Sequence, residues 1–230
     1  MLKRVFFILA IPAALVFFKA QAEGGVLPLG VGGTRAEAGV RSFQELRQTN
    51  VVKQRWDMSC GAAALSTLLT YHYNDPVPES EIIIGILKTT DPMKVRARGG
   101  FSLMDLKKFT DRYGYKGAGY AELTLDDLTG FKTPAIIPVN IKNYDHFVVF
   151  RGAYGDRVLF SDPVYGAVSM QKKRFLEIWK NGIGFVLKKE GAELQGGLLP
   201  SAEDFLVTDG AALRRAVSGI RPDPPTRHGP

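Results

Sequence analysis

Cys60 is the residue whose type and surroundings point most directly to chemistry. It is the single cysteine of the 230-residue chain, and Gly61 follows it at the start of a helix that we expect over about residues 60–73. A helix N-terminus offers free amide donors and a partial positive charge, and both stabilise a thiolate. Gly61 allows another chain to approach closely. We therefore favour a reactive nucleophile over a small buried core residue, the common alternative for a lone cysteine.

A thiolate that attacks a carbonyl needs a proton carrier, and the chain has three histidines. His72 lies twelve residues along the same predicted helix, which places it about 18 Å from the thiol. His228 falls in a proline-rich tail that is not expected to pack. His146, at the start of an apolar strand, remains by elimination, with a hydrogen-bonded structural histidine as the alternative.

Asp162 is the candidate for the carboxylate that orients the histidine. It ends a predicted strand and is followed by a proline and a glycine that favour a fixed turn. If residues 146–152 and 156–162 pair as a hairpin about Tyr154, Asp162 returns to the level of His146. The alternative is an aspartate that only binds the backbone of its own turn.

A developing oxyanion needs hydrogen-bond donors. The backbone amide of Cys60 is one, because it lies at a helix N-terminus. Gln54, six residues earlier, could supply a side-chain amide. A glutamine at that spacing is weak support by itself.

These residues together resemble the bacteriocin-processing cysteine peptidase family, whose papain-like domain removes double-glycine leader peptides. The resemblance covers about residues 51–189 and implies that Cys60 is the nucleophile, His146 the general base and acid, Asp162 the orienting group and Gln54 the oxyanion donor. Ser59 stands where many members have aspartate. The motifs that carry the resemblance are Gln54-x5-Cys60-Gly61-x-Ala63, His146-Phe147-Val148-Val149 and Asp162-Pro163-x-x-Gly166.

The same resemblance has implications for substrate and partners. A double-glycine peptidase needs a narrow cleft that excludes a Cβ, and Trp56, Met58, Tyr144 and Tyr165 flank the three motifs as candidate substrate-binding walls. Each could equally be ordinary packing. Among family members, the chain is similar to the stand-alone periplasmic proteases of pseudomonad functional-amyloid export systems. The implied partners are an exported protein or peptide, amyloid subunits, or an outer-membrane exporter.

Two other functions share these features. A peptidase-like module could dock a secretion substrate without cleaving it, although such relatives typically lose the nucleophile. A Cys-His-Asp acyltransferase of the transglutaminase kind has the same three residue types. The presence of all three favours a secreted cysteine endopeptidase.

Helices dominate the first half of the domain and strands the second, which predicts an α+β, papain-like fold with an N-terminal helical half and a C-terminal antiparallel sheet. Short polar turns between the strands favour antiparallel pairing. Besides residues 60–73, helices are expected over 79–87, from Ser102 to about 113 and over 172–179, and strands over 134–140, 146–150, 157–160 and 183–188.

The first 22 residues have the layout of a secretory signal peptide: a basic start, an apolar run of 14 residues and an A-x-A pattern. This run is shorter than the ~20 residues of a membrane-spanning helix, although an uncleaved anchor is the alternative. We expect a periplasmic protein with a signal peptide at 1–22, a flexible lead-in at 23–48, a peptidase domain at 49–190 and a largely disordered extension at 191–230.

Composition excludes several other classes. One cysteine allows neither an intramolecular disulfide nor a metal site built from several thiolates, so no metal or cofactor is expected. The net charge is +7, and loss of the signal, which carries three basic residues and no acid, lowers it to +4. With the basic residues spread along the chain, no nucleic-acid partner is expected, and no stable membrane span remains after signal removal.

Overall fold

The computed structural model describes residues 25–31, 34–40, 47–141, 143–192, 194–200 and 204. The signal peptide predicted at 1–22 lies outside these residues. Contacts divide the chain into two units, Met1–Ser42 and Phe43–Pro230, which are treated separately.

The first unit contains a β-hairpin. Strands β1 (Gly25–Val31) and β2 (Thr34–Val40) pair in antiparallel fashion along their whole length, from Gly25↔Val40 to Val31↔Thr34. The expectation of a flexible lead-in over 23–48 is therefore wrong for these two strands. A Gly-Gly pair between two extended runs is a sequence signal for a hairpin, which the expectation of a flexible lead-in left out.

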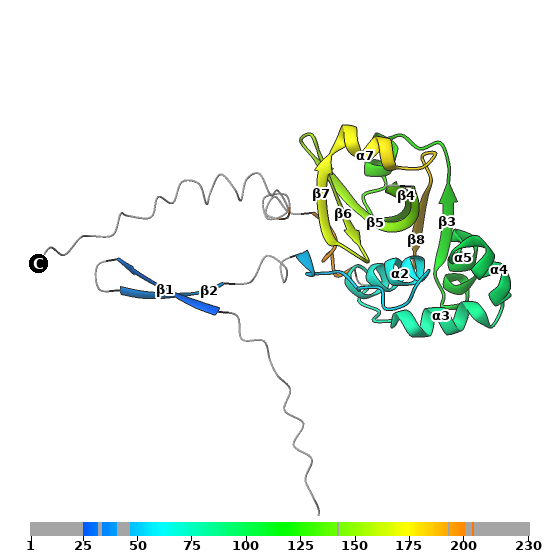
Figure 1. The fold of residues 1–230 in the computed structure, drawn as a ribbon, viewed down its shortest axis with the longest axis horizontal. Coiled ribbons are helices and arrows are strands. Elements are labelled where there is room, and N and C mark those ends of the chain that lie inside the picture. The colour runs from blue at the N-terminus through cyan, green and yellow to red at the C-terminus, as the bar shows by residue number, and fades with distance from the viewer. Residues whose placement is uncertain are drawn as a thin grey trace, which may run out of the picture. The chain divides into compact units, whose positions relative to one another are not determined.

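The second unit carries helices mainly in its first half and strands in its second (Figure 1). The helices are α2 (Cys60–Tyr71), α3 (Glu79–Leu87), α4 (Pro92–Arg98), α5 (Leu103–Arg112), α6 (Leu125–Gly130) and α7 (Lys172–Ile178). The strands are β3 (Lys116–Tyr120), β4 (Ala135–Ile141), β5 (Tyr144–Tyr154), β6 (Arg157–Asp162), β7 (Gly166–Gln171) and β8 (Gly184–Lys188).

The strands of this unit form one six-stranded sheet in the order β3-β8-β4-β5-β6-β7. Every neighbouring pair is antiparallel. Helix α2 lies along one side of the sheet and α7 on the other, while α3, α4 and α5 gather beyond α2 (Figure 1). This arrangement confirms the predicted α+β class with its helical half and antiparallel sheet.

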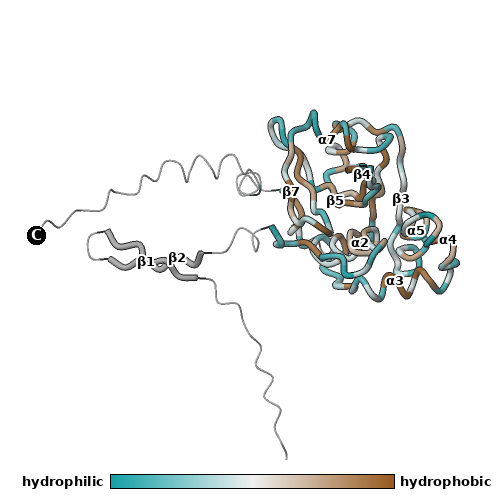
Figure 2. Tube along the Cα trace, viewed as in Figure 1, coloured by the Kyte–Doolittle hydropathy of each residue, from teal (hydrophilic) through white to brown (hydrophobic). Residues whose placement is uncertain are grey.

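Two hydrophobic clusters hold these layers together. The first joins α2, α3 and α5 to the sheet and includes Leu65, Phe109 and Val149. The second lies under α7 and includes Phe160 and Phe175. Helix α2 and the inner strands are accordingly the more hydrophobic parts of the trace (Figure 2). Each such buried side chain contributes about 1.5–3 kcal/mol, so α2, and with it Cys60, is firmly fixed against the sheet.

The compact unit continues past residue 190. Residues 191–230 were expected to be largely disordered, but the described segment 194–200 packs onto the domain. Leu198 is fully buried in the first cluster, and its carbonyl accepts a hydrogen bond of 2.8 Å from Nε of the buried Arg151. Further hydrogen bonds run from the side chain of Asn50 to the carbonyl of Gly197 and from the backbone amide of Gln195 to the carbonyl of His72. Composition alone did not indicate this docking.

Candidate active site

Cys60 is the first residue of α2, as predicted, and only 6% of its surface is exposed. The preceding residue, Ser59, occupies the N-cap position, but its side chain does not cap the helix. A Cβ on Gly61 would lie 3.3 Å from the ring of Phe147. The close approach at Gly61 is therefore to the chain's own strand β5, which places the start of α2 directly beside the residue after His146.

His146 and Asp162 are joined by a buried hydrogen bond. Nε2 of His146 lies 3.0 Å from Oδ1 of Asp162, and neither side chain has appreciable exposure. The same Oδ1 accepts the backbone amides of Val164 at 2.7 Å and Tyr165 at 3.1 Å. Asp162 therefore binds the backbone of its own turn and also holds the histidine, so this one residue makes the contacts that both interpretations predict.

A β-bulge brings the two side chains to the same face of the sheet. Near the turn, Tyr154 pairs with Arg157, whereas Val149 pairs with Ser161 because the register shifts by one residue between Phe150 and Gly152. Successive side chains in a strand alternate between faces, so a one-residue shift exchanges the faces. The simple hairpin about Tyr154 is therefore wrong in register, although it correctly places the two residues near each other.

The charge on the imidazole follows from its neighbours. Burial lowers the pKa of His146, but its contacts with the Asp162 carboxylate and the Cys60 thiol outweigh this and raise the pKa to about 9. Nε2 of His146 is hydrogen-bonded to Asp162, so the other ring nitrogen, Nδ1, remains for the thiol of Cys60. Nδ1 is buried and has no hydrogen-bond partner among the described residues. The site therefore favours an imidazolium beside Cys60 at neutral pH.

Gln54 lies next to the turn that follows Asp162. Its backbone amide donates to the carbonyl of Pro163 at 3.0 Å. Its side-chain Nε2 donates to the carbonyl of Trp56 at 3.3 Å, and its Oε1 is buried without a partner. Among the described contacts, no hydrogen bond joins this side chain to Cys60, so its role as oxyanion donor stays a prediction that requires Nε2 to turn.

A cleft of about 320 Å³ opens beside Cys60 and His146. One wall is the loop that follows α4 and contains Gly99 and Gly100. The opposite wall comes from β4, β5 and the segment before β8. The lining residues are Cys60, Arg98, Gly99, Gly100, Phe101, Ser102, Pro138, Asp145, His146, Phe147, Lys180, Asn181 and Ile183.

The four side chains predicted to wall the cleft lie elsewhere. Trp56 and Met58 line an adjacent apolar hollow of about 460 Å³ formed with α3 and α4. Tyr144 and Tyr165 are largely exposed and line neither space. Tyr144 nevertheless stays near the site, with its ring 5.8 Å from that of His146. Burial raises the pKa of Tyr144, and the negative charges of Cys60, Asp57 and Asp162 raise it further.

Comparison with known proteins identifies the family to which this chain belongs. The chain matches the Peptidase C39 family over residues 48–191. It belongs to the Peptidase C39 family. It is therefore a cysteine peptidase, and the resemblance identified from its motifs is confirmed.

Two relatives are similar over most of this C39 peptidase. One is the probable functional amyloid protease FapD of Pseudomonas fluorescens, 39% identical over 160 residues, which are 70% of each chain. The other carries the same name in Pseudomonas aeruginosa and is 35% identical over 189 residues, 82% of each chain. Among solved structures, the peptidase domain of Streptococcus ComA, a bi-functional ABC transporter, matches with a TM-score of 0.52 and 21% identity. It covers 62% of this chain and is itself covered completely, which confirms the papain-like fold.

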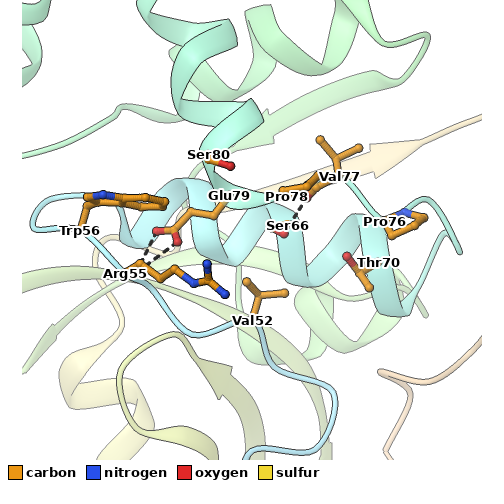
Figure 3. Close-up of a pocket in the computed structure, with 10 residues that line it drawn as sticks. All are labelled: Val52, Arg55, Trp56, Ser66, Thr70, Pro76, Val77, Pro78, Glu79 and Ser80. Atoms are coloured by element: carbon orange, nitrogen blue, oxygen red, sulfur yellow. Dashed lines mark hydrogen bonds between the residues drawn. The ribbon is translucent and has the colours of Figure 1, made fainter. Parts of the chain in front are cut away.

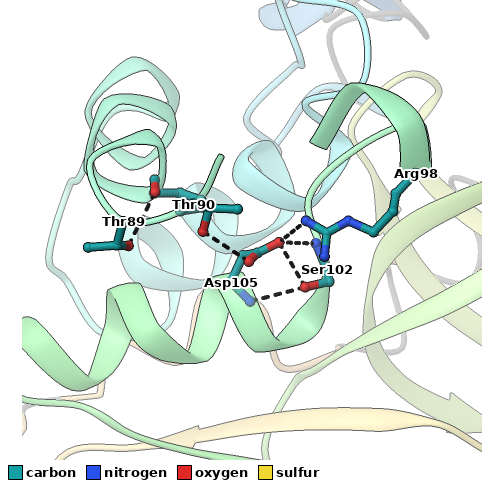
Figure 4. Close-up of polar contacts among 6 residues, drawn as sticks. Thr89, Thr90, Arg98, Ser102 and Asp105 are labelled. Atoms are coloured by element: carbon teal, nitrogen blue, oxygen red, sulfur yellow. Dashed lines mark hydrogen bonds and ion pairs between the residues drawn. The ribbon is translucent and has the colours of Figure 1, made fainter. Parts of the chain in front are cut away.

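The glycine wall of the cleft in this C39 peptidase is held by a buried carboxylate (Figure 4). Asp105 accepts hydrogen bonds from Arg98, from the backbone and hydroxyl of Ser102, each at 2.8 Å, and from Thr90 at 3.1 Å. Burial acts to raise the pKa of Asp105, but these hydrogen bonds and the charge of Arg98 lower it. Ser102 and Asp105 form a complete capping box at the start of α5. The sequence did not indicate that this box braces the cleft.

Within the described ranges, no cluster of three or more histidine, cysteine or acidic side chains is placed to hold a metal ion. In the same ranges, no helix has both the length and the apolar character needed to cross a membrane.

Proposed function

We propose that this cysteine peptidase cleaves an exported protein or peptide after small residues of the Gly-Gly type. The observation that carries the proposal is the cleft beside Cys60, because one wall is the bare backbone of Gly99 and Gly100 and the other includes Phe147. A Cβ on Gly100 would lie 3.0 Å from the carbonyl oxygen of Met58, so the backbone of this wall packs closely against the loop before Cys60. An extended glycine segment fits between such walls, and larger side chains clash with them.

The geometry supports the proposed roles of the residues, except that Gln54 must first turn its Nε2 away from the carbonyl of Trp56. The thiolate of Cys60 attacks the scissile carbonyl, and a C–S bond forms while the imidazolium of His146 donates its proton to the leaving amine. Neutral His146 then takes a proton from water, the resulting hydroxide attacks the thioester, and breaking of the C–S bond regenerates the thiolate beside the imidazolium. Asp162 keeps the ring in place through Nε2. The backbone amide of Cys60 and the side chain of Gln54 donate to the oxyanion.

We place this activity in the periplasm, in support of functional-amyloid secretion. The signal-peptide pattern in residues 1–22 and the similarity to two proteins named functional amyloid protease support that setting. The partners that fit are amyloid-forming subunits or an outer-membrane exporter.

The test is to incubate purified exported partners with the wild-type enzyme and with Cys60→Ala and to measure intact masses. Cleavage after Gly-Gly or Gly-Ala by the wild type alone is expected. Replacing the glycine before the cut with valine should lower kcat/KM by at least ~10²-fold. Equal cleavage after large apolar residues would contradict the proposal, and a product that gains the mass of an added amine would indicate acyl transfer instead.

A further inference from the structure

Glu79 is a buried carboxyl group directly behind the nucleophile. It is the first residue of α3 and is 4% exposed. Figure 3 shows it reaching from α3 to the loop that carries Arg55 and Trp56. Its Oε2 accepts the backbone amide of Arg55 at 3.1 Å, and its Oε1 lies 2.6 Å from Oγ of Ser59. Glu79 therefore contacts the residue after Gln54 and the residue before Cys60.

Counting protons shows which ionisation state of Glu79 makes both short contacts of Ser59 hydrogen bonds. Oγ of Ser59 lies 2.6 Å from two oxygens, the carbonyl of Trp56 and Oε1 of Glu79. A serine hydroxyl has one proton to donate, and a carbonyl oxygen can only accept. When the hydroxyl donates to Trp56, the second short contact is a hydrogen bond only if Oε1 carries a proton and donates to Ser59. Oε2 is then the carbonyl oxygen of the acid, which is the atom nearer to the amide of Arg55.

The charges around Glu79 permit a neutral acid. Burial raises the pKa of Glu79. It outweighs the effects that lower the pKa, which are a Ser59 hydroxyl donating to the carboxylate, the backbone amide of Arg55 and the charge of Arg55. Arg55, on the loop, is the charged side chain that acts on it there. Cys60 is the nearest titratable group on α2. On α3 itself, Glu81 faces away, where its carboxylate accepts the hydroxyl of Tyr113 at 2.7 Å.

We propose that Glu79 is a positioning residue that works in its protonated form. Its proton completes a chain of hydrogen bonds from Glu79 through Ser59 to the carbonyl of Trp56. This chain of hydrogen bonds fixes the loop between Gln54 and Cys60. Loss of that proton leaves two oxygens competing for the single hydrogen of Ser59, so one end of the loop is released.

This chain of hydrogen bonds also reaches the predicted oxyanion donor. The Trp56 carbonyl that accepts from Ser59 at 2.6 Å is the same atom that accepts Nε2 of Gln54 at 3.3 Å. A carbonyl already satisfied by the short bond holds the longer one weakly. When Glu79 is protonated, Nε2 of Gln54 is therefore free to turn toward the oxyanion. When Glu79 is ionised, it draws the hydroxyl of Ser59 away from the carbonyl of Trp56, and this carbonyl then binds Nε2 of Gln54 more strongly.

The test compares two replacements of Glu79 with one control on the same helix. Glutamine reproduces the neutral acid, since its amide can donate to Ser59 while its oxygen accepts from Arg55; alanine reproduces neither contact. The readout that needs no substrate is the rate of iodoacetamide alkylation of Cys60, the single cysteine. We expect Glu79→Ala to lower this rate at least fivefold, Glu79→Gln to stay within about twofold, and Glu81→Gln to have no effect.

Two further measurements separate positioning from a loss of folding. Far-UV circular dichroism and thermal unfolding identify any variant that fails to fold, and Ser59→Ala provides a second, milder break of the same chain. The double variant Ser59→Ala/Glu79→Ala should alkylate no more slowly than Glu79→Ala alone, because both substitutions remove the same linkage. Carboxyl ¹³C NMR of the folded wild type should show Glu79 still protonated at pH values where Glu81 is ionised. If Glu79→Gln is as slow as Glu79→Ala, or the carboxyl of Glu79 is ionised together with that of Glu81, the proposal is wrong.

Discussion

The two halves of the active site are held in place by different kinds of structure. His146 and Asp162 stand on adjacent strands inside a six-stranded sheet, where ladder hydrogen bonds and buried side chains fix their register. Cys60 stands at the end of a helix whose preceding loop, residues 54–59, is tied down by a few side-chain hydrogen bonds. A register is kept or lost as a whole, whereas single hydrogen bonds each contribute about 0.5–1.5 kcal/mol.

This difference indicates where the enzyme can be adjusted. Changes on the sheet side should have large effects, because they act directly on the proton relay. Changes on the loop side should act in graded steps, because each contact there can weaken without disturbing the others. The following experiments test that contrast, from the largest expected effect to the smallest.

Removing either reacting group should abolish turnover. Cys60→Ala deletes the nucleophile and His146→Ala deletes the proton carrier, and we expect each to lower kcat at least ~10³-fold. Product formation by intact-mass spectrometry is the measurement, with circular dichroism as the check on folding. Near-normal turnover in folded His146→Ala would overturn the assignment of the sheet side.

Asp162→Asn should weaken the sheet side without deleting it. The pKa of His146 is raised to about 9, so the imidazolium is present below that value and is lost as the pH rises through it. We therefore expect kcat/KM to fall above about pH 9 in the wild type. In Asp162→Asn this alkaline limb should move to lower pH, with turnover reduced about 10²-fold. Asp156→Asn, at the exposed turn of the same hairpin, is the control, and an unmoved limb in Asp162→Asn would argue against the coupling.

Leu198→Ala should show whether the C-terminal segment supports the sheet side. The carbonyl of Leu198 accepts a hydrogen bond from Arg151 of β5. The side chain of Leu198 is fully buried, so its truncation to alanine leaves a cavity in the core. We expect a loss of about 2–5 kcal/mol in the free energy of unfolding, measured by urea titration. Leu199→Ala, at a half-exposed neighbour, should cost less than about 0.5 kcal/mol. Equal effects of the two substitutions would mean that the segment does not dock as described.

Gly100→Ala should produce the smallest and most graded effect, on the loop side. Gly100 has φ +152°, and its added Cβ would lie 3.0 Å from the carbonyl oxygen of Met58. We expect a loss of about 1–3 kcal/mol in stability and a several-fold fall in kcat, because the loop before Cys60 is pushed aside. Gly119→Ala is the control, since nothing lies within 4 Å of its added Cβ. A Gly100→Ala enzyme with unchanged stability and kcat would show that the two loops do not depend on each other.

Sequence reasoning located the elements with strong local signals. The predicted bounds of the helix at 79–87 are those of α3, and Ser102, the predicted start of the next helix, is the N-cap of α5. It missed the seven-residue α4 and six-residue α6, which are too short to show a helical period. It also missed β3, whose Gly117 and Gly119 give no alternation of apolar and polar residues.

The parts of the site that sequence could not supply depend on contacts between distant segments. Cys60, His146 and Asp162 were found by type and elimination. The glycines at 99 and 100 were not, because they enter the site only when the loop after α4 meets β5. The role that we propose for Glu79 is equally non-local, since twenty residues separate it from Ser59 along the chain.

The bulge at Arg151 makes the spacing of the two relay residues a question of parity. In a regular hairpin with a two-residue turn, residues on the same face of the two strands are separated by an odd number of positions along the chain. His146 and Asp162 are 16 positions apart, an even number, and share a face because the bulge adds one residue to β5. A relative without the bulge but with the same turn must therefore space its histidine and aspartate by an odd number. A gap placed in β5 when such sequences are aligned records a change of face as well as a change of length.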